Sequence, residues 1–423
     1  MKDPLANSYY AATANLWERP TAVELARRYD VAVIGGGFTG LSAALSCAEK
    51  GFSVILLEAQ TIGYGASGRN GGQLIPGLRW SMREVDTAFG RERASAIFDL
   101  AWSAVDRVNR RITRHNIACD LKSGHLEAAF KPAHFGEMQR DADFLSAQFG
   151  WDSIDVIAPK DMSRHISGGG YHGGVFDRRG GHFHPLNYAL GLATAAAAAG
   201  VTIVENCPVE RISDGARVGV SANGAGVTAD HAIVATDSWM HHLLPDQGRY
   251  TVPIMNYNIA TAPLGVRADA LLPSDAAVAD SRFVLNYFRL SADKRMIFGG
   301  GEKYVQSPLA DIAAFVRNHM AKVFPALAET PIDFAWGGAV GVTMNRLPQL
   351  GRTGNIFYAH GFSGHGALIT TLAGELIADA LSGAASGFDV FEALPHRPFP
   401  GGKWLKTPLA TLGLFWYALR DRL

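Results

Sequence analysis

The sequence predicts an α/β protein with two domains, one of alternating strands and helices and one with a mainly antiparallel sheet covered by helices. Three observations lead to this prediction. Residues 30–58 contain an apolar run, a glycine-rich turn, a helical pattern and a second apolar run. Residues 252–298 contain runs that alternate like sheet strands, and a strand and helix pattern returns at residues 356–381. With 423 residues, the chain is also longer than one simple core usually supports.

The first of these segments has the spacing G-x-G-x-x-G, formed by Gly35, Gly37 and Gly40. Gly35 permits a tight turn after the strand, Gly37 lets a pyrophosphate approach the backbone, and Gly40 lets the helix pack closely on the strand. The N–H groups at the start of the helix attract phosphate. Glu58 ends the second strand, where a carboxylate can bind both ribose hydroxyls. The pattern predicts a Rossmann-like domain that binds an adenine dinucleotide.

The rest of the pattern gives the expected order of elements. We expect helices in residues 85–150, 186–199, 312–324 and 368–381. We expect strands at residues 201–204, 233–235, 252–261, 283–290, 295–298 and 356–359, with a hairpin at 218–227. The predicted dinucleotide-binding domain comprises residues 28–90, 161–245 and 335–395. The predicted second domain, for substrate, comprises residues 91–160 and 246–334, and residues 396–423 form a C-terminal tail.

Composition and charge exclude several classes of protein. Lys plus Arg and Asp plus Glu are both 39, so no excess of positive charge indicates nucleic-acid binding. No apolar run approaches the roughly 20 residues of a membrane-spanning helix, and no apolar signal segment opens the chain, so we expect a cytoplasmic protein. The apolar residues 407–419 predict a docked terminal helix, with contact to a membrane surface as the alternative. Cys47, Cys119 and Cys207 are widely spaced, so we expect buried free thiols.

Two further glycine-rich segments favour a flavin over a nicotinamide. Residues 61–74, TIGYGASGRNGGQL, combine glycines with polar side chains, so the backbone can approach a large flat ring and hydrogen-bond to it. A nicotinamide enzyme more often continues here into another parallel strand and helix. Residues 360–367, HGFSGHGA, precede a helix whose N-terminus would stabilise the negative charge of a reduced flavin. Together with the first turn, these segments predict FAD.

Several motifs carry a resemblance that covers nearly the whole chain. They are SYYAATAN at residues 8–15, IGGGFTGLSAAL at 34–45, IGYGASGRNGGQL at 62–74, GGHFHPLN at 180–187, GFSGHG at 361–366 and LPHRPFPGG at 394–402. Through them the sequence resembles the FAD-dependent oxidoreductases of the D-amino-acid oxidase, glycine oxidase and sarcosine oxidase group. Within this group it is most similar to the bacterial gamma-glutamylputrescine oxidoreductases, and GASGRNGGQ and GFSGHG are specific to that branch.

The resemblance implies which residues hold the cofactor. Glu58 and Ala59 would bind the adenosine ribose, and the backbone of Val209 would meet the adenine. The pyrophosphate would lie on Gly35, Gly37, Phe38, Thr39 and Gly40. The flavin and its ribityl chain would be lined by Gly65, Ala66, Ser67, Arg69, Asn70, Gly71, Gly72, Gln73 and Leu74. The pyrimidine edge of the ring would be covered by Gly361, Phe362, Ser363, Gly364, His365 and Gly366.

Some relatives attach the flavin covalently through a histidine of the first loop. In this sequence Arg69 stands where that histidine would be expected. The resemblance therefore implies non-covalent FAD.

The reaction that the resemblance implies is oxidation of a C–N bond. A neutral primary or secondary amine gives a hydride to the flavin, and the imine hydrolyses to an aldehyde and ammonia or a smaller amine. Oxygen reoxidises the flavin and yields hydrogen peroxide. The expected partner is a small-molecule amine with an acidic tail, such as a gamma-glutamylated polyamine.

Four residues are candidates for catalysis or substrate binding: Tyr287, Arg289, His182 and His365. Tyr287 and Arg289 share one face of an expected strand, where they clamp the polar tail of an amine or form an outward-facing pair. Each histidine either contacts substrate or satisfies backbone at a turn. We expect no metal site, because no nearby Cys, Asp or Glu completes a ligand set with His182 and His184.

Several alternatives remain open at this point. The enzyme could be a dehydrogenase that passes electrons to a quinone or carrier, or its substrate could be an N-methyl amino acid, an aminophosphonate or an omega-amino acid. The chain could also be a flavin-binding scaffold without turnover, or a nicotinamide dehydrogenase. A serine hydrolase is disfavoured, because Ser363 and His365 share a turn with no evident third member of a triad.

Overall fold

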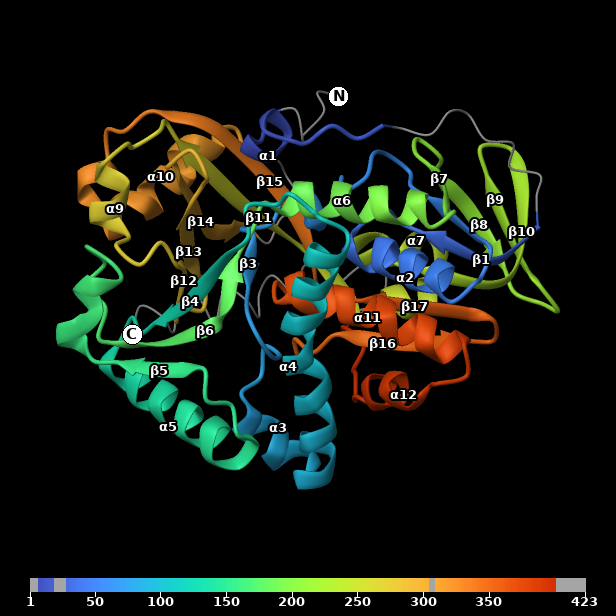
Figure 1. The fold of residues 1–423 in the computed structure, drawn as a ribbon, viewed down its shortest axis with the longest axis horizontal. Coiled ribbons are helices and arrows are strands. Elements are labelled where there is room, and N and C mark those ends of the chain that lie inside the picture. The colour runs from blue at the N-terminus through green and yellow to red at the C-terminus, as the bar shows by residue number, and fades with distance from the viewer. Residues whose placement is uncertain (1–6, 19–27, 304–308, 401–423) are drawn as a thin grey trace.

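Two sheets organise the protein in the computed structural model, which describes residues 7–18, 28–303 and 309–400 (Figure 1). The first sheet has eight strands and the second has nine, and the chain passes from one to the other several times. Helices pack against both sheets. The predicted α/β architecture with a second, mainly antiparallel sheet is confirmed.

The first sheet has a parallel centre in the order β16-β17-β10-β1-β2-β7. Its strands are β1 (Arg28–Ile34), β2 (Val54–Leu57), β7 (Thr202–Val204), β10 (Ala225–Val234), β17 (Ile356–His360) and the antiparallel edge strand β16 (Gln349–Thr353). The hairpin partners β8 (Val209–Ser213) and β9 (Val218–Ala222) continue from β10. The central strands are apolar and buried on both faces, as parallel strands covered by helices usually are.

Four helices of this half pack against one another. They are α2 (Phe38–Glu49), α4 (Arg91–Arg114), α6 (Pro185–Ala198) and α11 (Gly366–Leu381). Helices α2 and α11 approach closely at Gly374, where an added Cβ would lie 2.6 Å from the backbone nitrogen of Ala43. Because both helices begin at glycine-rich turns, this packing brings the two turns to the same side of the sheet (Figure 1).

The second sheet has the order β15-β11-β14-β13-β12-β4-β6-β3, with β5 beside β6. Its strands are β3 (Gln73–Leu74), β4 (Lys122–Ala128), β5 (Ile154–Ile157), β6 (Gly174–His182), β11 (Thr251–Thr261), β12 (Ala277–Asp280), β13 (Asn286–Leu290), β14 (Met296–Lys303) and β15 (Ile332–Thr343). Helix α10 (Ile312–Val323) packs on β14 and β11, and α5 (Pro132–Phe149) packs on β5 and β6. Neighbouring strands are antiparallel except for the parallel pair β12 and β4.

Short elements complete the described chain. The remaining α-helices are α1 (Tyr9–Ala12), α3 (Met82–Phe89), α7 (Met240–Leu243), α8 (Pro245–Gly248), α9 (Arg267–Leu271) and α12 (Ser386–Glu392). The 3-10 helices are η1 (Ala66–Gly68), η2 (Pro159–Arg164), η3 (Asp237–Trp239) and η4 (Pro325–Leu327).

The expectation of helix throughout residues 85–150 was wrong at β4, because KSGHLEA forms a strand at the centre of the second sheet. Its charged and glycine residues hide the alternation that identifies a strand. Strands β5, β6 and β15 were not predicted either. The predicted domain borders remain predictions, although β3 and β6 pair in the second sheet and those borders assign them to the first domain.

The N-terminal motif SYYAATAN connects distant parts of the chain through hydrogen bonds. The Ser8 hydroxyl caps α1 by accepting from the backbone N–H of Ala11. The phenol of Tyr10 accepts a hydrogen bond of 3.1 Å from Arg289 on β13. The backbone N–H of Asn15 donates to the side chain of Asn187 in the first turn of α6. These contacts join the start of the chain to both sheet regions.

Within the described ranges no helix is long and apolar enough to cross a membrane. The apolar tail at residues 407–419, with its predicted docked helix, lies outside those ranges. Cys47, Cys119 and Cys207 are buried and free, as expected.

Candidate functional site

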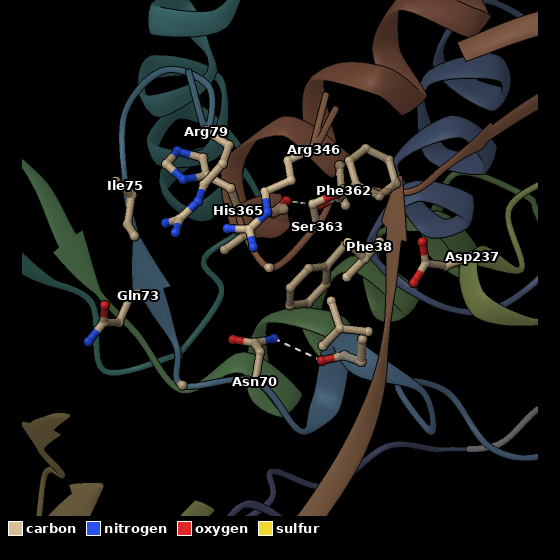
Figure 2. Close-up of a pocket in the computed structure, with 18 of the residues that line it drawn as sticks. Phe38, Asn70, Gln73, Ile75, Arg79, Asp237, Arg346, Phe362, Ser363 and His365 are labelled. Atoms are coloured by element: carbon tan, nitrogen blue, oxygen red, sulfur yellow. Dashed lines mark hydrogen bonds between the residues drawn. The ribbon is translucent and has the colours of Figure 1, made fainter. Parts of the chain in front are cut away.

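A cavity of about 1070 Å³ lies where the two sheets meet and is lined by residues of both. Its volume is slightly above the roughly 300–1,000 Å³ typical of small-molecule and cofactor sites. Figure 2 shows part of its lining, with Phe38 and Asp237 from the first sheet region, Gln73 on β3 of the second sheet, and Ile75 just after that strand. The cavity has room for a large cofactor together with a substrate.

The first glycine turn forms one wall. Gly35 has a φ of 110°, and an added Cβ there would lie 2.6 Å from the carbonyl oxygen of Ala235. Gly37, Phe38 and Thr39 line the cavity at the start of α2. Gly40 does not line it, because this residue packs against the turn, where an added Cβ would lie 1.9 Å from the Gly35 oxygen. The positive end of the α2 dipole therefore faces the cavity.

Glu58 lies beside this turn at the end of β2. Its carboxylate accepts hydrogen bonds of 2.6 Å and 2.8 Å from the backbone N–H groups of Gly36 and Gln60. Burial raises the pKa of Glu58, and the two N–H groups oppose the rise. Ala59 and Val209 line the same end of the cavity. A half-buried acceptor beside a helix N-terminus is the arrangement expected for an adenosine ribose and its phosphates.

The loop of residues 65–74 crosses the middle of the cavity, and its polar side chains mainly hold the loop in shape. The Ser67 hydroxyl accepts a 2.9 Å hydrogen bond from the backbone N–H of Phe38. The Asn70 amide donates to the carbonyls of Ala66 and Ser67 and accepts from the N–H of Gly72. Figure 2 shows one of the bonds that the amide nitrogen donates as a dashed line. Cavity-lining members of this loop are Gly65, Ala66, Ser67, Arg69, Asn70, Gly71 and Gln73.

Arg69 is buried and directed toward backbone carbonyls. Its Nε donates 2.6 Å to the Tyr64 oxygen, and its Nη1 donates 3.1 Å to the Gly337 oxygen. Its guanidinium also lies 4.5 Å from the centre of the Tyr64 ring. Gly72 and Leu74 of the same loop do not line the cavity, because they pair with β6 and its neighbour Phe183.

The second glycine turn, residues 361–366, closes another side of the cavity at the start of α11. Phe362, Ser363, Gly364, His365 and Gly366 line the cavity, whereas Gly361 packs against Thr343. The Ser363 hydroxyl donates to the Gly361 oxygen and accepts from the backbone N–H of Thr343. Ser363 is thus occupied by the turn itself.

His365 is the one residue of this turn that the sequence named as a candidate for catalysis or substrate binding. Burial and the nearby charge of Arg79 lower the pKa of His365 from 6.5 to about 4, so the ring is neutral near pH 7. Among the described residues its buried Nε2 has no hydrogen-bond partner. A neutral imidazole with an unpartnered nitrogen keeps the capacity for one more hydrogen bond.

The structure brings Tyr287 to the cavity but not the other two candidates. The Tyr287 phenol donates to the side chain of Asn256, which also lines the cavity. Arg289 lies beneath the loop and donates to the Gly71 oxygen and to Tyr10. The Nε2 of His182 bonds the Asp275 carbonyl, and burial lowers the pKa of His182 to about 3. His182 and Arg289 are therefore placed to support the fold, and neither lines the cavity.

Several cavity residues were not identified from the sequence. Asp237 follows β10 and accepts hydrogen bonds from the backbone N–H groups of Gly361 and Gly341, which ties the second turn to the first sheet. Its position after a parallel strand was an available signal, because ligands bind at such ends. Arg79 and Glu127 also line the cavity. Neither had a sequence signal, since Arg79 lies in an irregular segment and Glu127 on the unpredicted strand β4.

The residues on the cavity fit FAD. Two helix starts at glycine turns, a half-buried carboxylate at a strand end and a polar loop line one continuous space. The approach of the backbone is close, because an added Cβ at Gly37 would lie 2.9 Å from the Ser67 hydroxyl. His365 also lines this space, and its buried Nε2 has no hydrogen-bond partner among the described residues. No cluster of three or more metal-binding side chains was found in the part of the chain that is described.

Comparison with known proteins agrees with this fit. The family of FAD dependent oxidoreductases (DAO) matches residues 30–380. The chain is 36% identical to gamma-glutamylputrescine oxidoreductase of Escherichia coli over 99% of this chain and 98% of the relative. It is 34% identical to a probable oxidoreductase, OrdL, of Haemophilus influenzae over 98% of this chain and 97% of the relative.

Solved structures show the same fold. Glycine oxidase from Geobacillus kaustophilus superposes with a TM-score of 0.73 at 21% identity, over 88% of this chain and 99% of that one. L-proline dehydrogenase from P. horikoshii superposes with a TM-score of 0.71 at 20% identity, over 84% and 94%.

Proposed function

The chain belongs to the FAD-dependent oxidoreductase family, and from this premise we propose that it oxidises a C–N bond of a primary or secondary amine resembling gamma-glutamylputrescine. The observation that carries the proposal is the 36% identity to gamma-glutamylputrescine oxidoreductase across 99% of this chain and 98% of that relative. The size of the cavity supports it as well, since about 1070 Å³ accommodates an extended substrate beside the cofactor.

The residues of the chain would divide the work as follows. The N-terminus of α2 would bind the pyrophosphate, Glu58 the ribose, and the turn at residues 361–366 the pyrimidine edge of the flavin. The loop of residues 65–74 would lie along the ring. When bound, FAD would supply the hydride acceptor for oxidation of the carbon next to the amine nitrogen. Water would hydrolyse the resulting imine to an aldehyde and ammonia, or to a smaller amine where the substrate amine is secondary.

Two groups face the remaining space. Tyr287 and Asn256, joined by a hydrogen bond, form a polar patch of the second sheet that would orient the amine. His365 lines the wall near Arg79, and its imidazole is neutral near pH 7 because its pKa is lowered to about 4. Orientation and exclusion of water are the contributions that the protein must make, because the cofactor supplies the redox chemistry.

Anaerobic titration of the purified protein with gamma-glutamylputrescine tests the proposal. Bleaching of the flavin absorbance, followed by recovery and hydrogen peroxide when air is admitted, is the expected result. Bleaching without recovery would indicate a dehydrogenase that needs a quinone or carrier. Flavin that is bleached by no amine of a broad panel, including N-methyl and omega-amino acids, would refute amine oxidation.

A further inference from the structure

Two side chains of opposite charge face the cavity without a partner. Neither Arg79 nor Glu127 makes a hydrogen bond or an ion pair with any described residue, and both line the cavity. Six other carboxylates on the cavity wall have hydrogen-bond partners, whereas Glu137 on α5 has none among the described residues. The six are Glu58, Glu84, Asp141, Asp177, Asp237 and Asp280. The Glu127 side chain is open to the interior of the cavity. Its neighbour on β4, Leu126, is fully buried in the core.

The two charges are close but not joined. Burial raises the pKa of Glu127, the charge of Arg79 opposes that rise, and Asp141 adds to it. The charge of Arg79 also reaches His365. No ion pair within 4.0 Å links Arg79 to Glu127. Figure 2 shows the Arg79 guanidinium at the end of the cavity that holds His365 and Arg346.

The sheet register places Glu127 at a defined distance from Tyr287. Tyr287 pairs with Ala279 on β12, and Ala279 pairs with Glu127 on β4, so these side chains share one face of the sheet. Two strand spacings separate Tyr287 from Glu127, or roughly 10 Å. The Tyr287 ring packs on the loop of residues 65–74, because an added Cβ at Gly71 would lie 2.5 Å from it.

We propose that Arg79 and Glu127 form the two halves of a subsite for a zwitterionic amino acid head group at the far end of the substrate. The inference rests on the proposed function. Arg79 would bind the α-carboxylate and Glu127 the α-ammonium, so each charge in the cavity gains the partner that the protein does not supply. In a gamma-glutamyl amine, about eight bonds separate the reacting carbon from the α-carbon. An extended chain of that length spans roughly 9–10 Å, which matches the distance from Tyr287 to Glu127.

Three substrates that differ only in the head group test the subsite. Gamma-glutamylputrescine carries both charges, N-glutarylputrescine lacks the ammonium, and the α-amide of gamma-glutamylputrescine lacks the carboxylate. Rapid anaerobic mixing would measure the apparent Kd and the limiting rate of flavin reduction for each. In the natural protein, removal of either charge should raise the Kd roughly tenfold or more and leave the limiting rate nearly unchanged.

Each variant should then bind more weakly only those substrates that carry the charge recognised by the side chain it has lost. Glu127→Gln should raise the Kd for gamma-glutamylputrescine and for the α-amide, but not for N-glutarylputrescine. Arg79→Gln should raise the Kd for gamma-glutamylputrescine and N-glutarylputrescine, but not for the α-amide. Glu137→Gln removes another carboxylate of the cavity wall, on α5, and should leave all three values nearly unchanged.

Different outcomes would refute the head-group subsite and the proposed amine oxidation. The subsite would be overturned if the natural protein bound the three substrates with equal Kd, or if both variants raised the Kd equally for all three. Flavin bleaching by these substrates would still support amine oxidation in either case. An effect of Glu137→Gln equal to that of Glu127→Gln would also overturn it, because a general negative potential would then explain the binding. If a variant does not fold, the comparison of substrates in the natural protein decides. Failure of every amine to bleach the flavin would refute the proposed function itself.

Discussion

At the residue scale, many polar side chains of the predicted cofactor segments are occupied by the protein itself. Ser67 bonds Phe38, Asn70 folds its own loop, and Ser363 holds the second turn. Their residue types identified the segments, because such loops need short polar side chains to replace secondary structure. The sequence could not tell a side chain that shapes a loop from one that touches a ligand.

Tyr287 is the residue for which this distinction is testable. Its phenol donates to Asn256 on the cavity wall, so Tyr287→Phe removes one donor without changing the ring that packs on Gly71. We expect kcat/KM for the amine to fall about three- to tenfold, the effect of about one hydrogen bond. Steady-state kinetics measure it.

Tyr257→Phe is the matched control. Tyr257 is buried in the second sheet, does not line the cavity, and its phenol has no hydrogen-bond partner among the described residues. Its loss should leave kcat/KM unchanged. Equal kinetics for Tyr287→Phe and the natural protein would remove Tyr287 from the substrate site.

At the element scale, an ion-pair cluster fixes α11 against α4. Glu375 on α11 accepts hydrogen bonds of 2.5 Å from Arg107 and 2.8 Å from Arg111 on α4. Burial alone would raise the pKa of Glu375, but the two arginines outweigh it and lower the pKa below 4.5. Since α11 begins at the second glycine turn, this cluster also holds that turn in place.

Glu375→Gln should destabilise the protein at pH 7 by on the order of 2–4 kcal/mol, because it leaves the buried Arg111 without its charge partner. A carboxyl group whose pKa is lowered on folding adds stability above its unfolded pKa, and that stability is lost as the pH falls through the folded value. The difference between the variant and the natural protein should therefore be largest above about pH 4.5 and shrink below it. Urea unfolding across this pH range measures it.

Glu49→Gln serves as the comparison for that measurement. Glu49 on α2 pairs with Arg114 on α4, but the Arg114 side chain is 64% exposed, so the loss should be much smaller. A difference for Glu375→Gln that stays constant down to pH 3 would contradict the ion-pair explanation.

The elements that the sequence predicted share a local signal, and those that it missed do not. Strand β1, helix α2 and strand β2 combine continuous burial, 3.6-residue periodicity and glycine punctuation. Strand β15 contains FAWGGAVG, whose glycines argue against a strand but face Tyr257, Arg69 and Asp237 at close range. Those glycines are explained only by long-range packing, which one segment of sequence does not reveal.

At the scale of the whole molecule, the cavity is assembled from segments that alternate between the two sheets. Glu58 precedes the loop that crosses to β3, while Glu127 and Tyr287 lie on the second sheet, and the turn at residues 361–366 returns to the first. The nucleotide half was predictable because one continuous motif encodes it. In the substrate half Tyr287 was predicted but Glu127 was not, because the two residues come together only through the register of β4, β12 and β13.

The same assembly predicts that FAD is bound non-covalently. Arg69, at the loop position where some relatives carry an attached histidine, is engaged with the carbonyls of Tyr64 and Gly337. The three cysteines are buried and absent from the cavity wall. Denaturation in acid should therefore release all of the flavin into the supernatant and leave a non-fluorescent protein band on a denaturing gel, with a covalent flavoprotein as the positive control.

Because the ligand would bind the folded chain only, added FAD should also stabilise the protein by mass action, by about 2.7 kcal/mol at a hundredfold excess over Kd. The melting temperature of stripped protein should rise with each increase in FAD concentration, and adenosine alone should produce a smaller rise through the Glu58 end of the cavity. In the acid-release experiment described above, flavin fluorescence that stays with the denatured chain would show a covalent bond. A melting temperature that is independent of FAD would mean that the cavity between the two sheets is not the cofactor site, since a ligand that bridges both sheets must oppose their separation.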